Sequence, residues 1–416
     1  MEQQRPAVPT YILRGHEAAI HALHFYGNNA YLVSGDSDGW LVIWSLTTKR
    51  PLAVWKGHDA GVMAIHHWTD EELISHGRDH KLRVWQVRSE DLNRLSQRLP
   101  AEQAAADTST QARPWLLHSL SVNALNFCAF SMCDEEEDPH QQRQRQNSSA
   151  PTPQLIASPN GLDSGGIDIF QLPSEKRISQ APSQKDSSTG MVMAVSLFHA
   201  RQNSETLVLV SGYEDGRVMV HSYHGRLSAD GQNQSRSHWQ LRAVSKPHSQ
   251  PVLSLGVLPS RDCFFTSGAD AMIAKFSLAL SDRKEEGDLQ PEKLVNTKHT
   301  GQQGLSVRSD GKIFATAGWD ARVRVYSSRT LKELAVLKWH KVGCYATAFA
   351  NILPDETTGV IESNSDHEAS PGTSHAVTSS VSALDMIKRQ REEKARMTHW
   401  LAAGGKDGKI SLWDIY

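Results

Sequence analysis

A short segment recurs along this chain: a tight turn followed by a strand that ends in an aromatic residue. In the first copy, Asp38-Gly39 is the turn signal, because glycine accepts a positive φ at little cost. An aspartate precedes an aromatic residue by six positions at Asp38–Trp44, Asp79–Trp85, Asp270–Phe276, Asp320–Tyr326 and Asp407–Trp413. Two degraded copies lie at Asp215–His221 and Ser164–Phe170. Four-stranded propeller blades repeat roughly every 40–45 residues with a Trp at a strand end, so the pattern predicts an all-β, seven-bladed propeller.

Two further markers keep a fixed distance from the same aspartate. A histidine stands 21 or 22 residues before it in four copies, at His16, His58, His248 and His299. His118 and His340 suit the third and seventh copies if insertions follow them. A hydroxyl stands four residues before it at Ser34, Ser75, Ser211, Thr266 and Thr316, whereas the third copy has Asn160 there and the seventh has Ala403. The agreement of three residue types in spacing makes the repeat a strong signal.

With these markers the chain resembles the WD40 repeat family, and the resemblance implies a seven-bladed β-propeller. In that family the histidine, the hydroxyl, the turn aspartate and the Trp of a blade share a hydrogen-bond network. The residues that would form it are His16, Ser34, Asp38 and Trp44 in blade one, and His58, Ser75, Asp79 and Trp85 in blade two. The chemistry is sound in its own right, because a partly buried carboxylate needs donors, and imidazole, hydroxyl and indole groups supply them.

The two ends of the chain predict how the ring closes. The chain stops directly after the strand of Trp413, so the last blade lacks an outer strand, while residues 10–14 form a spare one. We expect residues 10–14 to complete blade seven, which removes open sheet edges. Residues 1–9 are expected to be a flexible tail, and residues 10–416 a single propeller with blades one and two at about 15–56 and 57–88.

Polar insertions account for the rest of the length, at about 89–112, 134–153 and 352–397. The first is expected to connect blade two to a third blade that begins near Trp115 and uses 122–127 as a strand. The other two are too polar to form a core and are expected to be disordered. The last turns helical from Ser382 through Arg396. That helix is either solvated or a docking element for a partner, with Leu384 and Ile387 on its apolar stripe.

Composition excludes several classes of function. The formal net charge of −2 gives no reason to expect nucleic acid or an anionic membrane as partner. Four scattered cysteines favour a reducing compartment, and no apolar run reaches the ~20 residues of a membrane span. We therefore expect a soluble, intracellular and monomeric propeller, although composition does not separate nucleus from cytoplasm.

The repeated His, Ser and Asp do not indicate an enzyme. A catalytic triad is needed once, whereas this set recurs around the ring, so hydrogen bonding is the better explanation. His66-His67 is a lone doublet without further ligands at metal spacing, and Gly404–Lys409 lacks the spacing of a phosphate loop. We expect no catalytic residue, no metal and no cofactor. The acidic run 134–138 is either a solvated loop or a site for a cation or a basic partner.

Six longer stretches carry a more specific resemblance, to the fungal ASTRA-associated protein 1 family. They are residues 11–16, 22–25, 76–85, 114–118, 125–128 and 400–413. This resemblance implies a non-catalytic, nuclear subunit of the ASTRA complex, linked to chromatin remodelling. It also implies protein partners that mature kinases of the phosphatidylinositol-3-kinase-related class. The alternative is a substrate-recognition subunit of a ubiquitin ligase.

One face is the candidate for binding these partners. The residues immediately before the turn aspartates point toward it: Ser37, Arg78, Glu214, Ala269, Trp319 and Lys406. Arg78 and Trp319 are of the types enriched in binding hot spots, and Trp339 is expected on the same side. The alternatives are that Trp319 packs between blades as core and that Arg78 pairs with a neighbouring acid.

Overall fold

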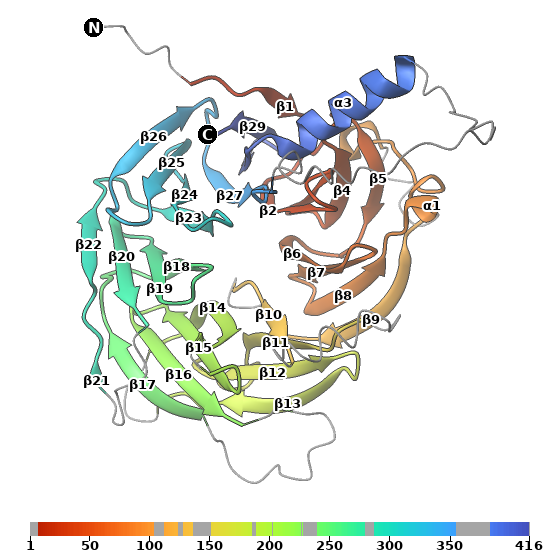
Figure 1. Cartoon of the computed structure of the whole chain (residues 1–416). Helices are drawn as coiled ribbons and strands as arrows, with labels where there is room; N and C mark the ends of the chain where they lie inside the picture. Colours follow the sequence, from red (N-terminus) through yellow and green to blue (C-terminus); the bar gives the residue numbers. More distant parts are fainter. Residues whose placement is uncertain are drawn as a thin grey trace, which may run out of the picture.

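Seven antiparallel sheets stand around a common axis like the blades of a propeller, with the chain running once around the ring (Figure 1). This computed structural model describes residues 7–103, 112–123, 128–135, 151–184, 189–201, 203–225, 227, 239–278, 287–354 and 383–415. The seven-bladed prediction is confirmed. Apolar side chains pack between neighbouring blades, and each of the largest buried clusters joins strands of two adjacent sheets.

Each blade runs from an inner strand at the axis to an outer strand at the rim. Blades one and two contain β2 (Ile20–Tyr26), β3 (Tyr31–Asp36), β4 (Trp40–Ser45) and β5 (Pro51–Lys56), then β6 (Val62–Thr69), β7 (Glu72–Gly77), β8 (Lys81–Gln86) and β9 (Trp115–Ser121). Blades three and four contain β10 (Ser131–Asp134), β11 (Gln154–Pro159), β12 (Ile167–Leu172) and β13 (Lys176–Ala181), then β14 (Val192–His199), β15 (Thr206–Tyr213), β16 (Val218–His224) and β17 (Trp239–Ser245).

Blades five to seven follow the same order. They contain β18 (Val252–Val257), β19 (Cys263–Gly268), β20 (Met272–Ser277) and β22 (Lys293–Asn296); β23 (Gln302–Val307), β24 (Ile313–Gly318), β25 (Arg322–Ser327) and β26 (Glu333–Lys338); and β27 (Cys344–Phe349), β28 (Trp400–Gly405), β29 (Ile410–Asp414) and β1 (Tyr11–Leu13). The short strand β21 (Gly287–Asp288) adds a fifth, parallel strand to the outer edge of blade four.

The N-terminal strand closes the ring, as the spare strand at the N-terminus predicts. Strand β1 pairs antiparallel with β29, so that Tyr11 faces Leu412 and Leu13 faces Ile410. Leu13 is only 1% exposed and joins the core cluster between blades seven and one. Three residues thus seal a sheet edge that would otherwise present unpaired backbone groups.

Blade two differs from the sequence prediction. Its outer strand is β9, so the insertion 89–112 lies between the third and fourth strands of this blade and not between blades two and three. The insertion contains α1 (Ser89–Leu92) and the 3₁₀ turn η1 (Pro100–Glu102), and its Leu92 and Leu95 are buried against blade one. The prediction that blade two ends at residue 88 is wrong, because no marker residue identifies an outer strand.

Blade three begins later in the chain than predicted. Its inner strand is β10, whereas residues 124–127 of the expected strand 122–127 lie outside the described residues. Most of the insertion 134–153 and residues 355–382 of the insertion 352–397 lie outside them as well. The last insertion ends in α3 (Ala383–Met397), close to the helix that the sequence predicts. No described helix is long and apolar enough to cross a membrane.

We predict that Leu13→Ala lowers the free energy of unfolding by about 2–5 kcal/mol, because a buried leucine on the closing strand leaves a cavity. Tyr11→Ala is the control on the same strand, since that side chain is 44% exposed, and it should cost much less. Urea denaturation of both variants measures the difference. Equal effects would contradict a closing role for β1.

Candidate functional site

The predicted network of blade one forms with one different residue. His16 Nδ1 lies 2.6 Å from Asp36 Oδ2, and His16 Nε2 lies 2.7 Å from Ser34 Oγ. The Trp44 indole donates to the same hydroxyl at 2.8 Å. Asp38, the predicted acceptor, is exposed, and its backbone N–H donates to Asp36 Oδ1 at 3.0 Å. The assignment of Asp38 to the network is therefore wrong, and Asp36 takes its place.

A comparison with blade two explains the change. There His58 Nδ1 meets Asp79 Oδ1 at 2.9 Å, and the position equivalent to Asp36 is Gly77. A Cβ added to Gly77 would lie 2.1 Å from His58 Nδ1 and 2.6 Å from Asp79 Oδ1. Only glycine therefore leaves room for a carboxylate that reaches back from the turn. In blade one the residue at the glycine position carries the carboxylate itself.

Blade two places its four predicted residues together. Ser75 Oγ accepts from the Trp85 indole at 2.8 Å and lies 2.7 Å from His58 Nε2. Burial alone would raise the pKa of Asp79, but the hydrogen bonds from His58 and Arg83 outweigh burial and hold the pKa well below its usual range. Burial lowers the pKa of His58. The Asp79–Arg83 pair has no counterpart in blade one, where Val42 occupies the position of Arg83.

Blades five and seven also bond their histidine to a hydroxyl, but the hydroxyl comes from a different residue type or strand. In blade five, His248 joins Asp270 at 2.9 Å and Thr266 at 2.8 Å. In blade seven the hydroxyl comes from Ser411, which lies directly across from Ala403, and His340 Nε2 meets it at 2.9 Å. The two residues of a cross-strand pair have their side chains on the same face of the sheet. A hydroxyl at Ser411 can therefore take the place of one at position 403.

Blades three and four depart further from the repeat. His118 belongs to β9 of blade two and bonds Glu175 at 2.8 Å, so it is not the histidine of blade three. There Asn160 donates to Asp168 at 2.8 Å. In blade four, which has no marker histidine, the Tyr213 hydroxyl lies 3.1 Å from Ser211 Oγ.

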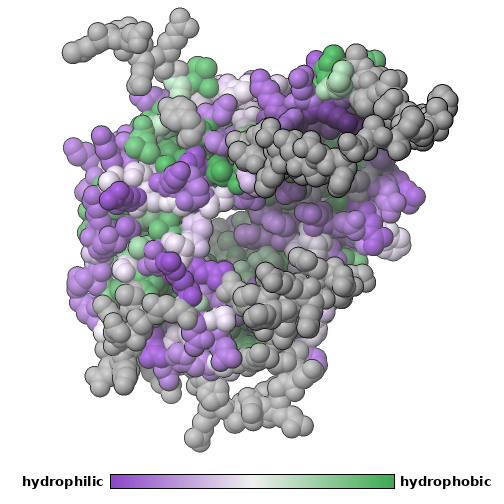
Figure 2. Space-filling model, in the orientation of Figure 1, coloured by the Kyte–Doolittle hydropathy of each residue, from purple (hydrophilic) through white to green (hydrophobic). Residues whose placement is uncertain are grey.

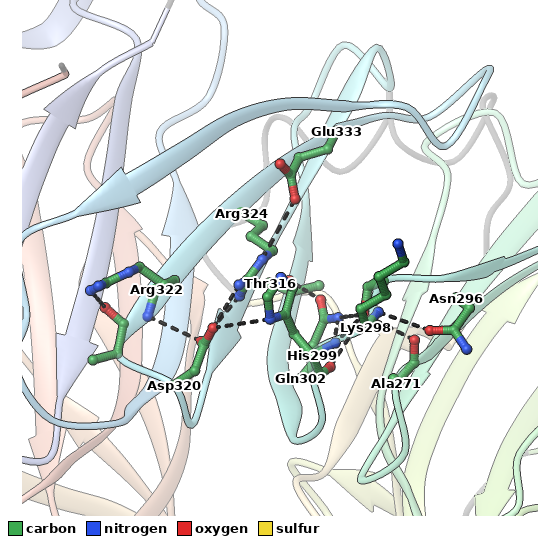
Figure 3. A network of polar contacts seen from close by, with 12 residues as sticks. Ala271, Asn296, Lys298, His299, Gln302, Thr316, Asp320, Arg322, Arg324 and Glu333 are labelled. Atoms are coloured by element: carbon green, nitrogen blue, oxygen red, sulfur yellow. Dashed lines mark hydrogen bonds and ion pairs between the residues drawn. The ribbon is translucent and has the colours of Figure 1, made fainter.

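Blade six replaces the marker histidine with an amide (Figure 3). Gln302 Oε1 accepts hydrogen bonds from Thr316 Oγ1 at 2.7 Å and from the Tyr326 hydroxyl at 3.2 Å. His299 remains 44% exposed and reaches Asp320 only at 3.6 Å. The figure shows the Arg324 guanidinium between Asp320 and Glu333, and its shorter contact is 2.6 Å to Asp320. The expectation that His299 serves this blade as His58 serves blade two is wrong.

The network has the hydrogen-bond pattern of a hydrolase triad, but a substrate cannot reach its hydroxyl. In blade two, Asp79, His58 and Ser75 are joined in that order, yet Ser75 is only 1% exposed and its oxygen already accepts from Trp85. A nucleophile must reach a substrate carbonyl, and this one is enclosed. Within the described ranges no group of three or more His, Cys, Asp or Glu side chains could hold a metal ion. These residues act through hydrogen bonds that hold the tight turns in place.

The fixed turns define one face of the propeller. The residue before each turn aspartate donates its backbone N–H to the loop that precedes the inner strand, at 2.8–3.0 Å. The donor–acceptor pairs are Ser37–Ala19, Arg78–Gly61, Glu214–Met191, Ala269–Pro251, Trp319–Gly301 and Lys406–Gly343. All six predicted positions are thus equivalent, and we call the surface they share the turn face.

Trp319 is a surface residue of this face and not core between blades. Its side chain is 46% exposed, and its indole donates to Gln303 Oε1 at 3.0 Å. The ring lies over Gly301, where an added Cβ would come within 2.2 Å of it. The loop therefore holds the ring in one position while leaving almost half of it open.

Tyr345 of blade seven and His21 of blade one lie between Trp319 of blade six and Arg78 of blade two in the order of the blades. The His21 and Tyr345 rings stack in parallel with centroids 4.9 Å apart. Burial lowers the pKa of His21, and the charge of the exposed Arg78 lowers it further. At Gly343 an added Cβ would lie 3.4 Å from Trp319 Cα and 3.6 Å from the Tyr345 ring. We call Arg78, His21, Tyr345 and Trp319 the inner arc.

Sequence reasoning missed two members of this arc, although a signal exists. His21 and Tyr345 stand five residues after the marker histidines His16 and His340. At both, the pairing register of the inner strand shifts, so each is the extra residue of a β-bulge. Bulges re-aim side chains, and here they turn two rings toward the turn face.

Trp339, the third predicted contact residue, is half-buried. It packs against the cluster between blades six and seven and meets the His340 ring edge-on with centroids 4.9 Å apart. The Arg14 guanidinium lies 6.0 Å from its ring centroid. Trp339 therefore offers only part of its ring and is not joined to the inner arc.

The repeated blades and their buried His–hydroxyl–Trp contacts define a propeller of the WD40 type. The model of the family described as ASTRA-associated protein 1 matches residues 9–413, so this chain belongs to that family. An ASTRA-associated protein 1 from Penicillium rubens is 48% identical over 100% of this chain and 99% of its own length. Those from Aspergillus niger and Schizosaccharomyces pombe are 48% and 31% identical, over 100% and 82% of this chain and 98% and 93% of their own lengths.

We predict that Asp36→Ala destabilises the protein by about 1–3 kcal/mol, because it removes the acceptor for buried His16 and for two backbone N–H groups. Asp38→Ala should change stability by less than about 0.5 kcal/mol, since that side chain is exposed. Chemical denaturation of the pair decides which carboxylate matters, and the reverse order would contradict the assignment.

A second prediction concerns pH. His76 is fully buried, neither ring nitrogen has a partner among the described residues, and burial lowers its pKa to about 3. Unfolded chains take up this proton near pH 6.5, so the folded state loses stability as pH falls from about 6.5 toward 3, by about 1.4 kcal/mol per unit.

His76→Leu should remove this contribution and flatten the pH dependence of unfolding between pH 6.5 and 4. At pH 7 the variant should be at least as stable as the original protein, because two unpaired polar atoms leave the core. Urea midpoints across this pH range test both statements. An unchanged slope would show that His76 is not neutral in the fold.

Proposed function

We propose that this protein is a non-catalytic interaction platform and that the inner arc receives a protein partner. The observation that carries the proposal is the inner arc itself, in which Arg78, His21, Tyr345 and Trp319 come from four successive blades and the His21 and Tyr345 rings stack across the boundary between two of them. Tryptophan, tyrosine and arginine are the residues that dominate binding energy at interfaces. Arg78 and Trp319 lie in tight turns and Tyr345 in an inner strand, so little ordering entropy is lost on binding.

The assembly we propose is an ASTRA-type complex in the nucleus. The relatives that match along their whole length are named ASTRA-associated protein 1, which supports membership in a multiprotein complex. In this proposal the complex is linked to chromatin remodelling and to the maturation of kinases of the phosphatidylinositol-3-kinase-related class. Its partners are other protein subunits, without nucleic acid, membrane or cofactor, and the propeller itself is monomeric.

We predict that Arg78→Ala combined with Trp319→Ala reduces recovery of the partner at least tenfold. The melting temperature should change by no more than about 3 °C, because both side chains are largely on the surface. Quantitative mass spectrometry after affinity purification of the tagged full chain from fungal cells measures recovery. Ser37→Ala, at the equivalent position of blade one, is the control and should leave recovery unchanged.

Two outcomes would contradict the proposal. Recovery that is unaffected, or that falls only in step with thermal stability, would show that the inner arc is not the binding site. Recovery of cullin-adaptor proteins in place of a remodelling or kinase-maturation assembly would favour a subunit of a ubiquitin ligase.

A further inference from the structure

The C-terminal end of helix α3 is anchored in the propeller. The Trp400 indole donates to Ala395 O at 2.7 Å, and Asn29 of blade one donates to Arg396 O at 3.0 Å. Thr398 Oγ1 donates to Lys394 O at 2.6 Å. These bonds satisfy carbonyls that the end of a helix leaves unpaired. Ala395 is 7% exposed in the cluster between blades seven and one, so this end is part of the core.

The other half of α3 extends past the rim of the ring (Figure 1). All described side chains from residue 384 to 391 are exposed. They include Leu384, Met386 and Ile387, which are 78%, 57% and 46% exposed. Figure 2 shows a hydrophobic patch at this end of the helix, next to strongly hydrophilic atoms. Three large apolar residues within four positions, none of them covered by the residues that the structure describes, form a hydrophobic patch.

The exposed charges beside this surface are mainly basic up to residue 391, and Glu392 and Glu393 follow. Lys388, Arg389 and Arg391 follow the apolar residues directly, and only Asp385 opposes them in the stretch 384–391. In the part of the chain that the structure describes, none of these three cations takes part in an ion pair or hydrogen bond. Exposed cations without partners cost nothing in water, but they favour a surface of opposite charge.

We propose that residues 384–391 of α3 form a docking helix that binds a protein groove with an apolar floor and an acidic rim. Leu384 and Ile387 lie one turn apart and enter the floor, while Lys388, Arg389 and Arg391 meet carboxylates at the rim. The anchored end fixes the direction of the helix, so the partner gains a preformed element and does not have to order it.

This docking helix is independent of the inner arc. Asn29, which holds α3, lies in the turn between β2 and β3, whereas Ser37 of the turn face lies in the next turn, between β3 and β4. Successive turns of an antiparallel sheet lie at opposite ends of its strands. The two surfaces are therefore on opposite faces, and one can fail without the other.

Two other occupants fit the observations less well. A lipid surface takes up helices with a broad apolar face, and here the apolar residues occupy about one turn. A second copy of α3 would bring its own Lys388, Arg389 and Arg391 against the first set, so like charges would oppose association.

The test begins with p-benzoylphenylalanine in place of Met386 in the full-length chain, irradiated in a fungal extract. We expect adducts on one protein, at positions that line a groove with Asp or Glu at its edges. Binding of that purified protein should weaken at least tenfold for L384S/I387S and for K388E/R389E/R391E. Changing the rim carboxylates to lysine should restore binding of the charge-reversed helix. Glu393→Gln, an exposed position near the anchored end, is the control and should bind normally.

Other results would overturn the proposal. Adducts on a surface without acidic residues would remove its basis, and so would variants that bind as tightly as the original protein. Flotation with vesicles of 30% phosphatidylserine in phosphatidylcholine that depends on Leu384 and Ile387 would assign the helix to lipid. A dimer in sedimentation velocity that L384S/I387S abolishes would assign it to a second copy. The melting temperature of each variant should match the original protein, because the substituted side chains are exposed.

Discussion

The structure depends on hydrogen-bond donors that reach a carboxylate beside the tight turn, which is most deeply buried in blades one, two and five. Asp36 in blade one is fully buried, and Asp79 and Asp270 are nearly so. Without donors such a group would cost several kcal/mol. The histidine that supplies one donor comes from the loop before the inner strand, and the hydroxyl behind it comes from the next strand. The hydrogen bonds to the carboxylate therefore join the loop, the strand and the turn of a blade, and they hold the loops of the turn face in fixed positions.

Spacing predicts this arrangement well where the blade has ordinary lengths. The ring, its closure and the residues His58, Ser75, Asp79 and Trp85 follow from the sequence because each marker has one candidate at its position. The prediction of the acceptor fails in blade one because two aspartates, Asp36 and Asp38, stand two positions apart and either could accept from His16. Only the three-dimensional structure around His16 shows that Asp36 is the acceptor. Prediction also fails where the geometry crosses strands: Ser411 serves in place of a residue at 403 because the two face each other.

The inner arc shows a different limit of sequence reasoning. Arg78 and Trp319 stand out by residue type, whereas His21 and Tyr345 are marked only by their distance of five residues from His16 and His340. The placement of His21 and Tyr345 depends on β-bulges in the inner strands, and a bulge is a matter of pairing register that period-two patterns do not encode. Strand β9 was missed for a related reason, because its residues Trp115, Leu116 and Leu117 are exposed and lack the alternation of a half-buried strand.

Both proposed surfaces are supported by contacts across the same boundary, the seam between blades one and seven. On the turn face His21 of blade one stacks on Tyr345 of blade seven, and on the opposite face Asn29 of blade one holds the helix that blade seven carries. Beside this seam, the strand that leads into blade one pairs with blade seven over only three residues of β1. A ligand that binds only the closed ring stabilises it in proportion to its concentration and affinity. A partner that contacts both His21 and Tyr345 would therefore stabilise the closed ring, so binding at the inner arc and closure of the ring are thermodynamically coupled.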